Sequence, residues 1–281
     1  MDKLLLVDGS NLLFQMFFGM PARIFNRNKK AVHGTIGFVG ALLKIMRFVK
    51  PTHVAVLFDG EHENARAALD CDYKANRPDY SCVPEAENPF SQLSDIYDAL
   101  DFLHLKHAET RDCETDDWIA GYALGYGKDA DVVISSFDSD YFQLLSDRVS
   151  VLRYRGIKTS IVTPRLLGEK FGILPSQYAD FKALVGDSSD NVKGAEKIGA
   201  KTAALLLNRF SSLEGVIQHA EEIAKPSVRA SVLKSAEKLK TNYEIIKLKG
   251  DAPLPFSLGE LIYRDDPLSS TEVLRGTGLL P

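Results

Sequence analysis

The chain has little cysteine and no long apolar run. Its 281 residues include only Cys71, Cys82 and Cys113, which are scattered and lack CxxC spacing. That pattern argues against a zinc site and is typical of a reducing compartment. No run of about 18 apolar residues occurs, and the start, MDKLLLVDG, carries an acid at its second position. We therefore expect neither a signal peptide nor a membrane span, but a cytoplasmic protein.

An excess of positive charge is also lacking. Lys and Arg number 34 against 38 Asp and Glu, giving a formal net charge of −4, which argues against a uniformly basic coat for nucleic acid. Nine of the acids, however, gather in short clusters, and without them the remainder is about +5. With 45% apolar and 26% charged residues the composition is globular, with material for one large core or two subdomains.

Buried strands alternate with helices over residues 1–162. We expect strands at 3–8, 52–60, 104–109, 131–137, 150–155 and 158–163, and helices at 10–19, 34–50, 89–103, 115–127 and 141–145. This alternation indicates an α/β fold with a mainly parallel central sheet covered by helices. Within it, residues 60–88 show no core-facing stripe, which is unusual in a compact domain and typical of a functional or disordered segment.

From residue 163 onward the pattern turns helical. Helices are expected at 164–172, 176–186, 201–210, 212–224 and 228–248, followed by an irregular tail with one strand or helix at most. We therefore predict an α/β core over 1–162 and a helical subdomain over 163–281. The aromatic run FQMFF (14–18) and Trp118 are predicted to lie in the core rather than to face a ligand.

Nine carboxylates stand where a strand or loop passes into a helix. Parallel strands bring their carboxyl ends to one edge of a sheet, so the acids that follow strands should share one crevice. Two unit charges about 4 Å apart repel by about 4 kcal/mol at an effective dielectric of about 20, so such a cluster needs cations. Taken singly, each acid could be a turn or cap residue. The nine are Asp8, Asp59, Glu114, Asp116, Asp117, Asp138, Asp140, Asp187 and Asp190.

Such clustered oxygen ligands point to particular ions and to one kind of reaction. Hard carboxylate oxygens suit Mg²⁺ or Mn²⁺. Two such ions can clamp a phosphodiester for in-line hydrolysis.

Two basic segments accompany the acids. YKANRP (73–78) offers an aromatic ring and two cations; it is either a solvated loop or a contact for a phosphate backbone or an unpaired base. GAEKIGAKTA (194–203) is not a Walker A loop, because Ala200 separates Gly199 from Lys201. It predicts instead a glycine-rich turn before a helix, where backbone N–H groups and lysines can hold a DNA phosphate. A purely structural helix–hairpin–helix is the alternative.

Six motifs in a fixed order carry a resemblance to a known family. They are LLLVDGSNLLF, PTHVAVLFDG, YKANRP, ETDDWIAGY, SSFDSDYFQLL and ALVGDSSDNVKGAEKIGAKTA, spread over about residues 1–250. The chain resembles the 5′-nuclease (flap endonuclease) superfamily, in particular the 5′-nuclease domain of bacterial DNA polymerase I and its stand-alone bacterial and phage relatives. Since no polymerase domain follows, we expect the stand-alone type.

The resemblance implies a divalent-metal-dependent 5′→3′ exonuclease and 5′-flap endonuclease. Such a protein would be a monomer acting on DNA with 5′ flaps, 5′ overhangs or nicks, in DNA replication and repair. The first of its two Mg²⁺ or Mn²⁺ ions would be held by Asp8, Asp59, Glu114 and Asp116, with Asp117 close by. Asp138, Asp140, Asp187 and Asp190 would hold or support the second.

The resemblance also assigns roles around the metals. Residues 60–88 would form an arch for the 5′ strand, with Lys74 and Arg77 near the scissile phosphate and Tyr73 stacking on a base. A helix–turn–helix element (186–205) would grip duplex phosphates, and its turn backbone would hold a K⁺ ion. The DNA-binding residues would be Arg66, Lys193, Gly194, Lys197, Gly199, Lys201 and Thr202, and the K⁺ site Val192, Ala195 and Ile198.

Three departures from the family pattern and two alternative functions remain. Gln15 stands where the family often has Arg, Ala65 where it often has an aromatic residue, and Lys193 where it often has Pro. Gln15 would remove a cation from the region of the reacting phosphate. The alternatives are an RNA-cleaving nuclease with a similar acidic fold and a non-catalytic DNA-junction-binding protein.

Overall fold

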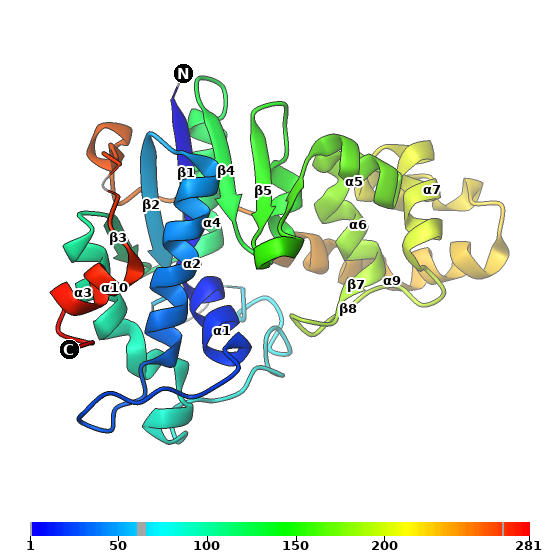
Figure 1. Cartoon of the computed structure of the whole chain (residues 1–281). Helices are drawn as coiled ribbons and strands as arrows, with labels where there is room; N and C mark the ends of the chain where they lie inside the picture. Colours follow the sequence, from blue (N-terminus) through cyan, green and yellow to red (C-terminus); the bar gives the residue numbers. More distant parts are fainter. Residues whose placement is uncertain (1, 61–65, 266) are drawn as a thin grey trace.

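A computed structural model describes residues 2–60, 66–265 and 267–281 (Figure 1); the departure at Ala65 lies outside these ranges. A six-stranded sheet in the order β3-β2-β1-β4-β5-β6 forms the centre. All neighbouring pairs are parallel except β5 and β6. The strands are β1 (Lys3–Asp8), β2 (His53–Phe58), β3 (Lys106–Glu109), β4 (Asp131–Ser135), β5 (Val149–Arg153) and β6 (Ser160–Val162).

Helices cover both faces of this sheet (Figure 1). One face packs against α1 (Gly9–Gly19), α2 (His33–Val49) and α3 (Leu93–Phe102), and the other packs against α4 (Thr115–Tyr126) and a 3₁₀ turn, Asp140–Leu144. Successive side chains of a strand point to opposite faces. Leu4 and Leu6 of β1 accordingly join the α4 side of the core, whereas Leu5 and Val7 join the α1–α2 side. The expected parallel α/β core is confirmed.

The strand order creates a crevice beside β1. From β1 the chain runs outward through β2 and β3, then crosses back to place β4 on the other side of β1. In open parallel sheets, ligands bind at such a reversal, outside the carboxyl ends of the strands. The register brings these ends level, with Asp8 beside Leu57 and Val7 beside Ser135.

Gly9 lets α1 begin directly at the end of β1. A Cβ atom at this position would lie 2.5 Å from the Phe58 ring. Phe58 is fully buried and stacks on Phe38, with 6.1 Å between the ring centroids. The ring therefore has little room to move, and only glycine allows this approach without repacking.

The helical part lies on one side of the sheet (right in Figure 1). It comprises α5 (Pro164–Phe171), α6 (Tyr178–Val185), α7 (Ala200–Phe210), α8 (Leu213–Gln218) and α9 (Pro226–Ile246), with a small hairpin of β7 (Gly186–Asp187) and β8 (Val192–Lys193). The hairpin was expected only as a turn. Asn242 on α9 holds it by donating to the carbonyl oxygens of Ala183 and Lys193, at 3.1 and 3.0 Å.

The C-terminal tail returns to the α/β part. It contains a 3₁₀ turn, Leu258–Leu261, and α10 (Ser270–Gly276). Val273 and Leu274 of α10 pack with Val39, Leu43 and Ala99 of α2 and α3. The tail was assigned to the helical subdomain, and α10 lies instead against the sheet-covering helices. The boundary at residue 162 stays a prediction.

Among the described residues, no helix has the length and apolar character that a membrane span requires.

Candidate metal centre

A cavity of about 800 Å³ opens at the carboxyl ends of the strands. Six carboxylates line it: Asp79 belongs to the arch, and the other five come from β1, the end of β2, the start of α4 and the loop after β4. Two cations of the arch, Lys74 and Arg77, also line it. The structure thus brings together acids that are far apart in the sequence, as expected. They are Asp8, Asp59, Glu114, Asp116 and Asp138.

Asp8 is held in place by the helix that follows it. Its Oδ1 accepts from the Asn11 backbone N–H at 2.9 Å, which caps α1, and its Oδ2 accepts from the Ser136 hydroxyl at 2.8 Å. Burial, and next the charge of Asp59, raise the pKa of Asp8 to about 7. In the metal-free cavity Asp8 is therefore partly protonated near neutral pH.

Two further contacts join the strand ends. Asp59 Oδ1 accepts from the Thr115 backbone N–H at 3.0 Å, and its own N–H donates to the Ser10 hydroxyl at 2.9 Å. The Tyr141 hydroxyl donates to Asp116 and lies 3.4 Å from Asp8 Oδ2. Burial, followed by the charge of Asp138, raises the pKa of Asp116 well above its ordinary value. The cavity is hence a place where added positive charge is strongly favoured.

A second acidic group lies beside the first. Carboxylate oxygens of Asp140, Asp187 and Asp190 all lie within 4.8 Å of one another. Asp138 adjoins this group, since its Oδ1 accepts from the Asp140 N–H at 2.8 Å, and it also lines the first cavity. The possible metal ligands in both groups are carboxylate oxygens, which fit hard divalent ions such as Mg²⁺ or Mn²⁺.

Cations of the protein pair with both acidic groups. Arg66, Lys74 and the Tyr73 hydroxyl contact Glu114, and Arg77 pairs with Asp190 at 2.9 Å. On α6, Lys182 pairs with Asp140 and Asp187. Lys182 was missed because sequence alone reads α6 as an ordinary amphipathic helix, although a lysine shortly before the DSSD motif was an available signal.

Three predicted site residues occupy other places than expected. Arg66, expected to bind DNA, is 5% exposed, and its Nη2 lies 2.7 Å from Asp117 Oδ1. Asp117 is not among the cavity residues, and it also accepts from the Lys249 N–H at 2.8 Å. Tyr73, expected to stack on a base, is 7% exposed. Arg66 and Tyr73 of the arch turn inward to contact Glu114, and Asp117 on α4 pairs with the buried Arg66.

Gln15 does not line the cavity either. Its Nε2 donates to the Tyr154 carbonyl at 2.6 Å, just beyond β5. The expected loss of a cation near the reacting phosphate stays a prediction. Gln15 ties α1 to the end of β5.

Aromatic side chains form the apolar wall of the cavity. Phe14, Tyr80 and Phe90 line it and meet edge to face, with 5.4–5.6 Å between ring centroids. Phe14 belongs to the FQMFF run that was expected in the core. Phe17 and Trp118 are buried as predicted, but Phe18 is 60% exposed. In the sequence, Phe14 differs from Phe17 only in its place on the helical turn.

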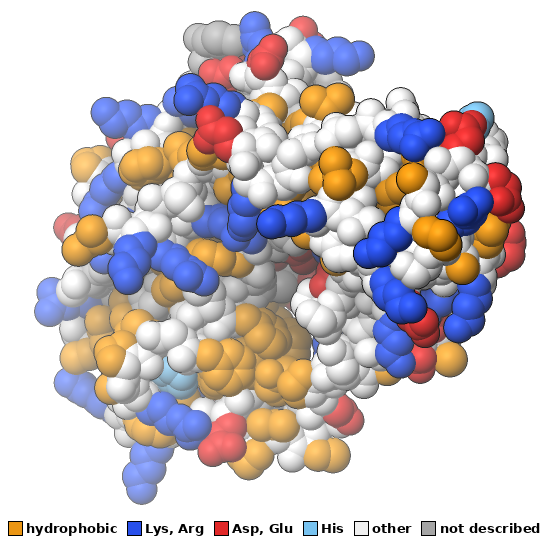
Figure 2. All heavy atoms as spheres, turned by 90° about the vertical axis from the view of Figure 1, so that its right-hand side faces the viewer, with side chains coloured by type: hydrophobic (Ala, Val, Ile, Leu, Met, Phe, Trp, Pro, Cys, Tyr) orange, Lys and Arg blue, Asp and Glu red, His pale blue; other side chains and the backbone are white. Residues whose placement is uncertain are grey.

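The β7–β8 hairpin and the start of α7 present exposed lysines, namely Lys193, Lys197 and Lys201. A Cβ atom at Gly194 would lie 2.4 Å from the Leu184 carbonyl oxygen, so this turn packs closely on α6. Gly199 precedes α7, and Thr202 lies in its first turn. Val192, Ala195 and Ile198 point their side chains into the core, and a K⁺ site at their backbone stays a prediction. Figure 2 shows Lys and Arg side chains gathered over this end of the molecule.

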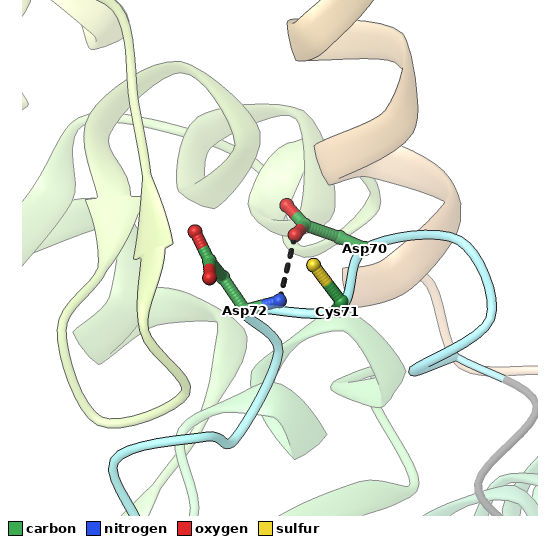
Figure 3. Close-up of side chains that lie close together, drawn as sticks. All are labelled: Asp70, Cys71 and Asp72. Atoms are coloured by element: carbon green, nitrogen blue, oxygen red, sulfur yellow. Dashed lines mark hydrogen bonds between the residues drawn. The ribbon is translucent and has the colours of Figure 1, made fainter.

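A third group of candidate ligands lies in the arch. Asp70, Cys71 and Asp72 are consecutive residues with their ligand atoms within 4.8 Å (Figure 3). Asp70 Oδ1 accepts from the Asp72 N–H at 2.9 Å. This is the ordinary geometry of an Asx turn, which accounts for the grouping without an ion.

Two family models match the chain. Residues 3–172 match the 5′-3′ exonuclease N-terminal resolvase-like domain, and residues 173–267 match the 5′-3′ exonuclease C-terminal SAM fold. The chain is 35% identical to the thermostable DNA polymerase I of Thermus aquaticus over 253 residues, which cover 90% of this chain and 29% of that protein. It is 32% identical to the 5′-3′ exonuclease of Buchnera aphidicola, over 92% of this chain and 90% of that protein.

Solved structures show the same fold. The T5 5′-exonuclease with bound divalent metal ions (zinc) superposes with a TM-score of 0.72 at 25% identity, covering 88% of this chain and 90% of that one. The catalytic core of Rad2 in complex with DNA substrate superposes with a TM-score of 0.61 at 12% identity, covering 98% of this chain and 93% of that one, a likeness that shows the fold alone.

Proposed function

Because the chain belongs to the 5′-3′ exonuclease family, we propose that it is a divalent-metal-dependent 5′→3′ exonuclease and structure-specific 5′-flap endonuclease acting on DNA. One observation carries this proposal: five carboxylates from separate elements meet in one cavity that arch cations also line. The raised pKa values of Asp8 and Asp116 support a demand for added cations there.

The two acidic groups suit two ions. Asp8, Asp59, Glu114 and Asp116 would hold the first, and Asp138, Asp140, Asp187 and Asp190 the second. Bound there, Mg²⁺ or Mn²⁺ supplies charge stabilisation to the attacking and leaving oxygens of a phosphodiester. Asp117 would act indirectly on the first ion, because it pairs with Arg66, which contacts Glu114.

The arch cations have a second partner when DNA is bound. Lys74 and Arg77 now neutralise Glu114 and Asp190. Once divalent ions satisfy those carboxylates, the same two side chains are available to the non-bridging oxygens of the scissile phosphate. There they would stabilise the charge that develops on these oxygens in the transition state.

Two surfaces would bind the rest of the substrate. Phe14, Tyr80 and Phe90 offer ring surfaces to an unpaired base near the 5′ end, since stacking accepts any base. Lys193, Lys197 and Lys201, with backbone N–H groups at Gly194, Gly199 and Thr202, would hold duplex phosphates. A K⁺ ion at the carbonyls of Val192, Ala195 and Ile198 would complete that contact. The protein would act as a cytoplasmic monomer in DNA replication and repair.

Cleavage of an end-labelled 5′-flap DNA, with and without Mg²⁺, tests the proposal. We expect metal-dependent cuts close to the flap junction, and release of short products from 5′ overhangs. Asp8→Asn should cut about a thousandfold more slowly, because several kcal/mol of charge stabilisation is lost. A matched RNA hairpin cut faster than the flap would favour an RNA nuclease. Tight flap binding with no cleavage in any metal would favour a non-catalytic junction-binding protein.

A further inference from the structure

A lysine occupies the second acidic group. Lys182 on α6 pairs through Nζ with both Asp140 Oδ1 and Asp187 Oδ2. Its side chain is only 8% exposed. These are two of the three carboxylates whose oxygens lie within 4.8 Å of one another. A single ammonium group therefore contacts two of the carboxylates that could hold a divalent ion.

The other cations near this group contact different acids. Arg77 pairs with Asp190 and approaches from the surface, with 53% of its side chain exposed. Lys182 instead comes from the interior, on a helix whose residues pack against α9, α7 and the 3₁₀ turn that starts at Asp140. Burial lowers the pKa of Lys182, but the charges of Asp140 and Asp187 outweigh it and raise this pKa. Burial raises the pKa of Asp187, but the charge of Lys182 outweighs it and lowers that pKa.

We propose that Lys182 is a resident cation of the second metal site: it holds Asp140 and Asp187 together in the metal-free protein and weakens the binding of a divalent ion there. This inference rests on the proposed two-metal function. Lys182 is a positioning residue, since it acts through the two carboxylates rather than on the substrate.

The physical reason is competition for the same oxygens. Two buried carboxylates without a counter-charge would destabilise the fold, and a lysine removes that penalty. A divalent ion then has to share or displace the ammonium, and so gains less than it would from free carboxylates. In the first acidic group Arg66 and Lys74 both pair with Glu114, whereas Asp8, Asp59 and Asp116 make no ion pair within the part of the chain that the structure describes. The second site should therefore fill at a higher metal concentration than the first.

Binding of Mn²⁺ followed by electron paramagnetic resonance tests this in the full chain. Wild type should bind in two phases. In Lys182→Met the weaker phase should tighten roughly tenfold, because one competing unit charge is gone. Lys170→Met is the matched control: it removes the same charge from an exposed position on α5 and should leave both phases unchanged. A weaker phase that is unchanged or lost in Lys182→Met overturns the inference.

Thermal unfolding gives a second readout that needs no cleavage. Lys182→Met should have a lower Tm than wild type in EDTA and a larger gain in Tm on adding Mn²⁺, since tighter binding stabilises the folded state more. Lys182→Gln, which keeps a hydrogen-bond donor without the charge, repeats the test. If both variants stay unfolded even in Mn²⁺, the lysine is needed for folding itself and the inference fails.

The two levels of failure can be told apart. If wild type binds no Mn²⁺ in either phase, the proposed metal-dependent function fails. If wild type shows two phases and neither Lys182 variant shifts the weaker one, the function stands and only the role of Lys182 is wrong.

Discussion

Arg77 in the arch forms an ion pair with Asp190 in the hairpin, with 2.9 Å between Nη2 and Oδ1. Backbone contacts reinforce it: the Lys74 N–H donates to the Asp190 carbonyl at 3.0 Å, and Asn191 Nδ2 donates to the Asp72 carbonyl at 2.8 Å. The described part of the arch is thus fastened to the same loop that supplies ligands of the second acidic group.

Removing this ion pair should affect both the arch and the reaction. In Arg77→Ala we expect faster amide hydrogen exchange at residues 72–77 in EDTA, and cleavage of a 5′ flap about a hundredfold slower, because a cation is lost near the phosphate. Arg264→Ala, an exposed arginine on the C-terminal tail, is the control and should change neither. Unchanged exchange in Arg77→Ala would show that the backbone contacts alone fasten the arch.

Phe14 should matter for unpaired bases and not for duplex. Loss of one stacking surface costs about 1–3 kcal/mol per base, so Phe14→Ala should weaken binding of a 5′-overhang DNA about tenfold. Blunt duplex should bind as before. Phe48→Ala, at a residue that is 57% exposed on α2, serves as the control. Equal weakening for overhang and blunt duplex would argue that Phe14 only supports the fold.

The hairpin lysines should set the salt dependence of DNA binding. Each phosphate contact contributes about 0.9 to the slope of log K against log salt, so Lys193→Ala, Lys197→Ala and Lys201→Ala combined should flatten it by about 3. Lys128 is exposed just before β4, at the amino-terminal ends of the parallel strands, so Lys128→Ala should leave the slope unchanged. Fluorescence anisotropy over a salt series measures it. A combined variant with the wild-type slope would place the duplex elsewhere.

The metal-free protein should lose stability as pH rises. The pKa of Asp8 is raised in the folded state from 3.8 to about 7, by burial and then by Asp59. Between these values the folded state holds a proton that the unfolded chain has released, so the free energy of unfolding falls with increasing pH. Tm in EDTA should therefore decrease from about pH 5 to about pH 8, less steeply in Asp8→Asn. A flat or rising profile contradicts a protonated Asp8.

The parallel sheet and the acidic cluster could be predicted from the sequence for a physical reason. A strand such as β1, apolar on both faces, and an acid directly after it are local features, and parallel topology then brings distant strand ends together. The strands and most helices differ from expectation by only a few residues at their ends. The family membership and the fold are likewise confirmed.

What sequence reasoning missed depends on contacts between distant segments. Lys182 becomes a partner of Asp140 only when α6 packs against the 3₁₀ turn, and Phe14 lines the cavity only because α1 is rotated to bury Phe17. The inward side chains of Arg66 and Tyr73 follow from the folding of the arch over Glu114. None of these relations leaves a periodic pattern in the chain.

The glycine after Asp8 carries a consequence for protein engineering. Because a methyl group at residue 9 would meet the Phe58 ring at 2.5 Å, alanine there would push the first turn of α1 away from the end of β2. Ser10, which binds the Asp59 backbone, sits in that turn. Attempts to stiffen α1 by replacing glycine, a common stabilising strategy, should therefore spare this position and choose Gly19, where no atom lies within 4 Å.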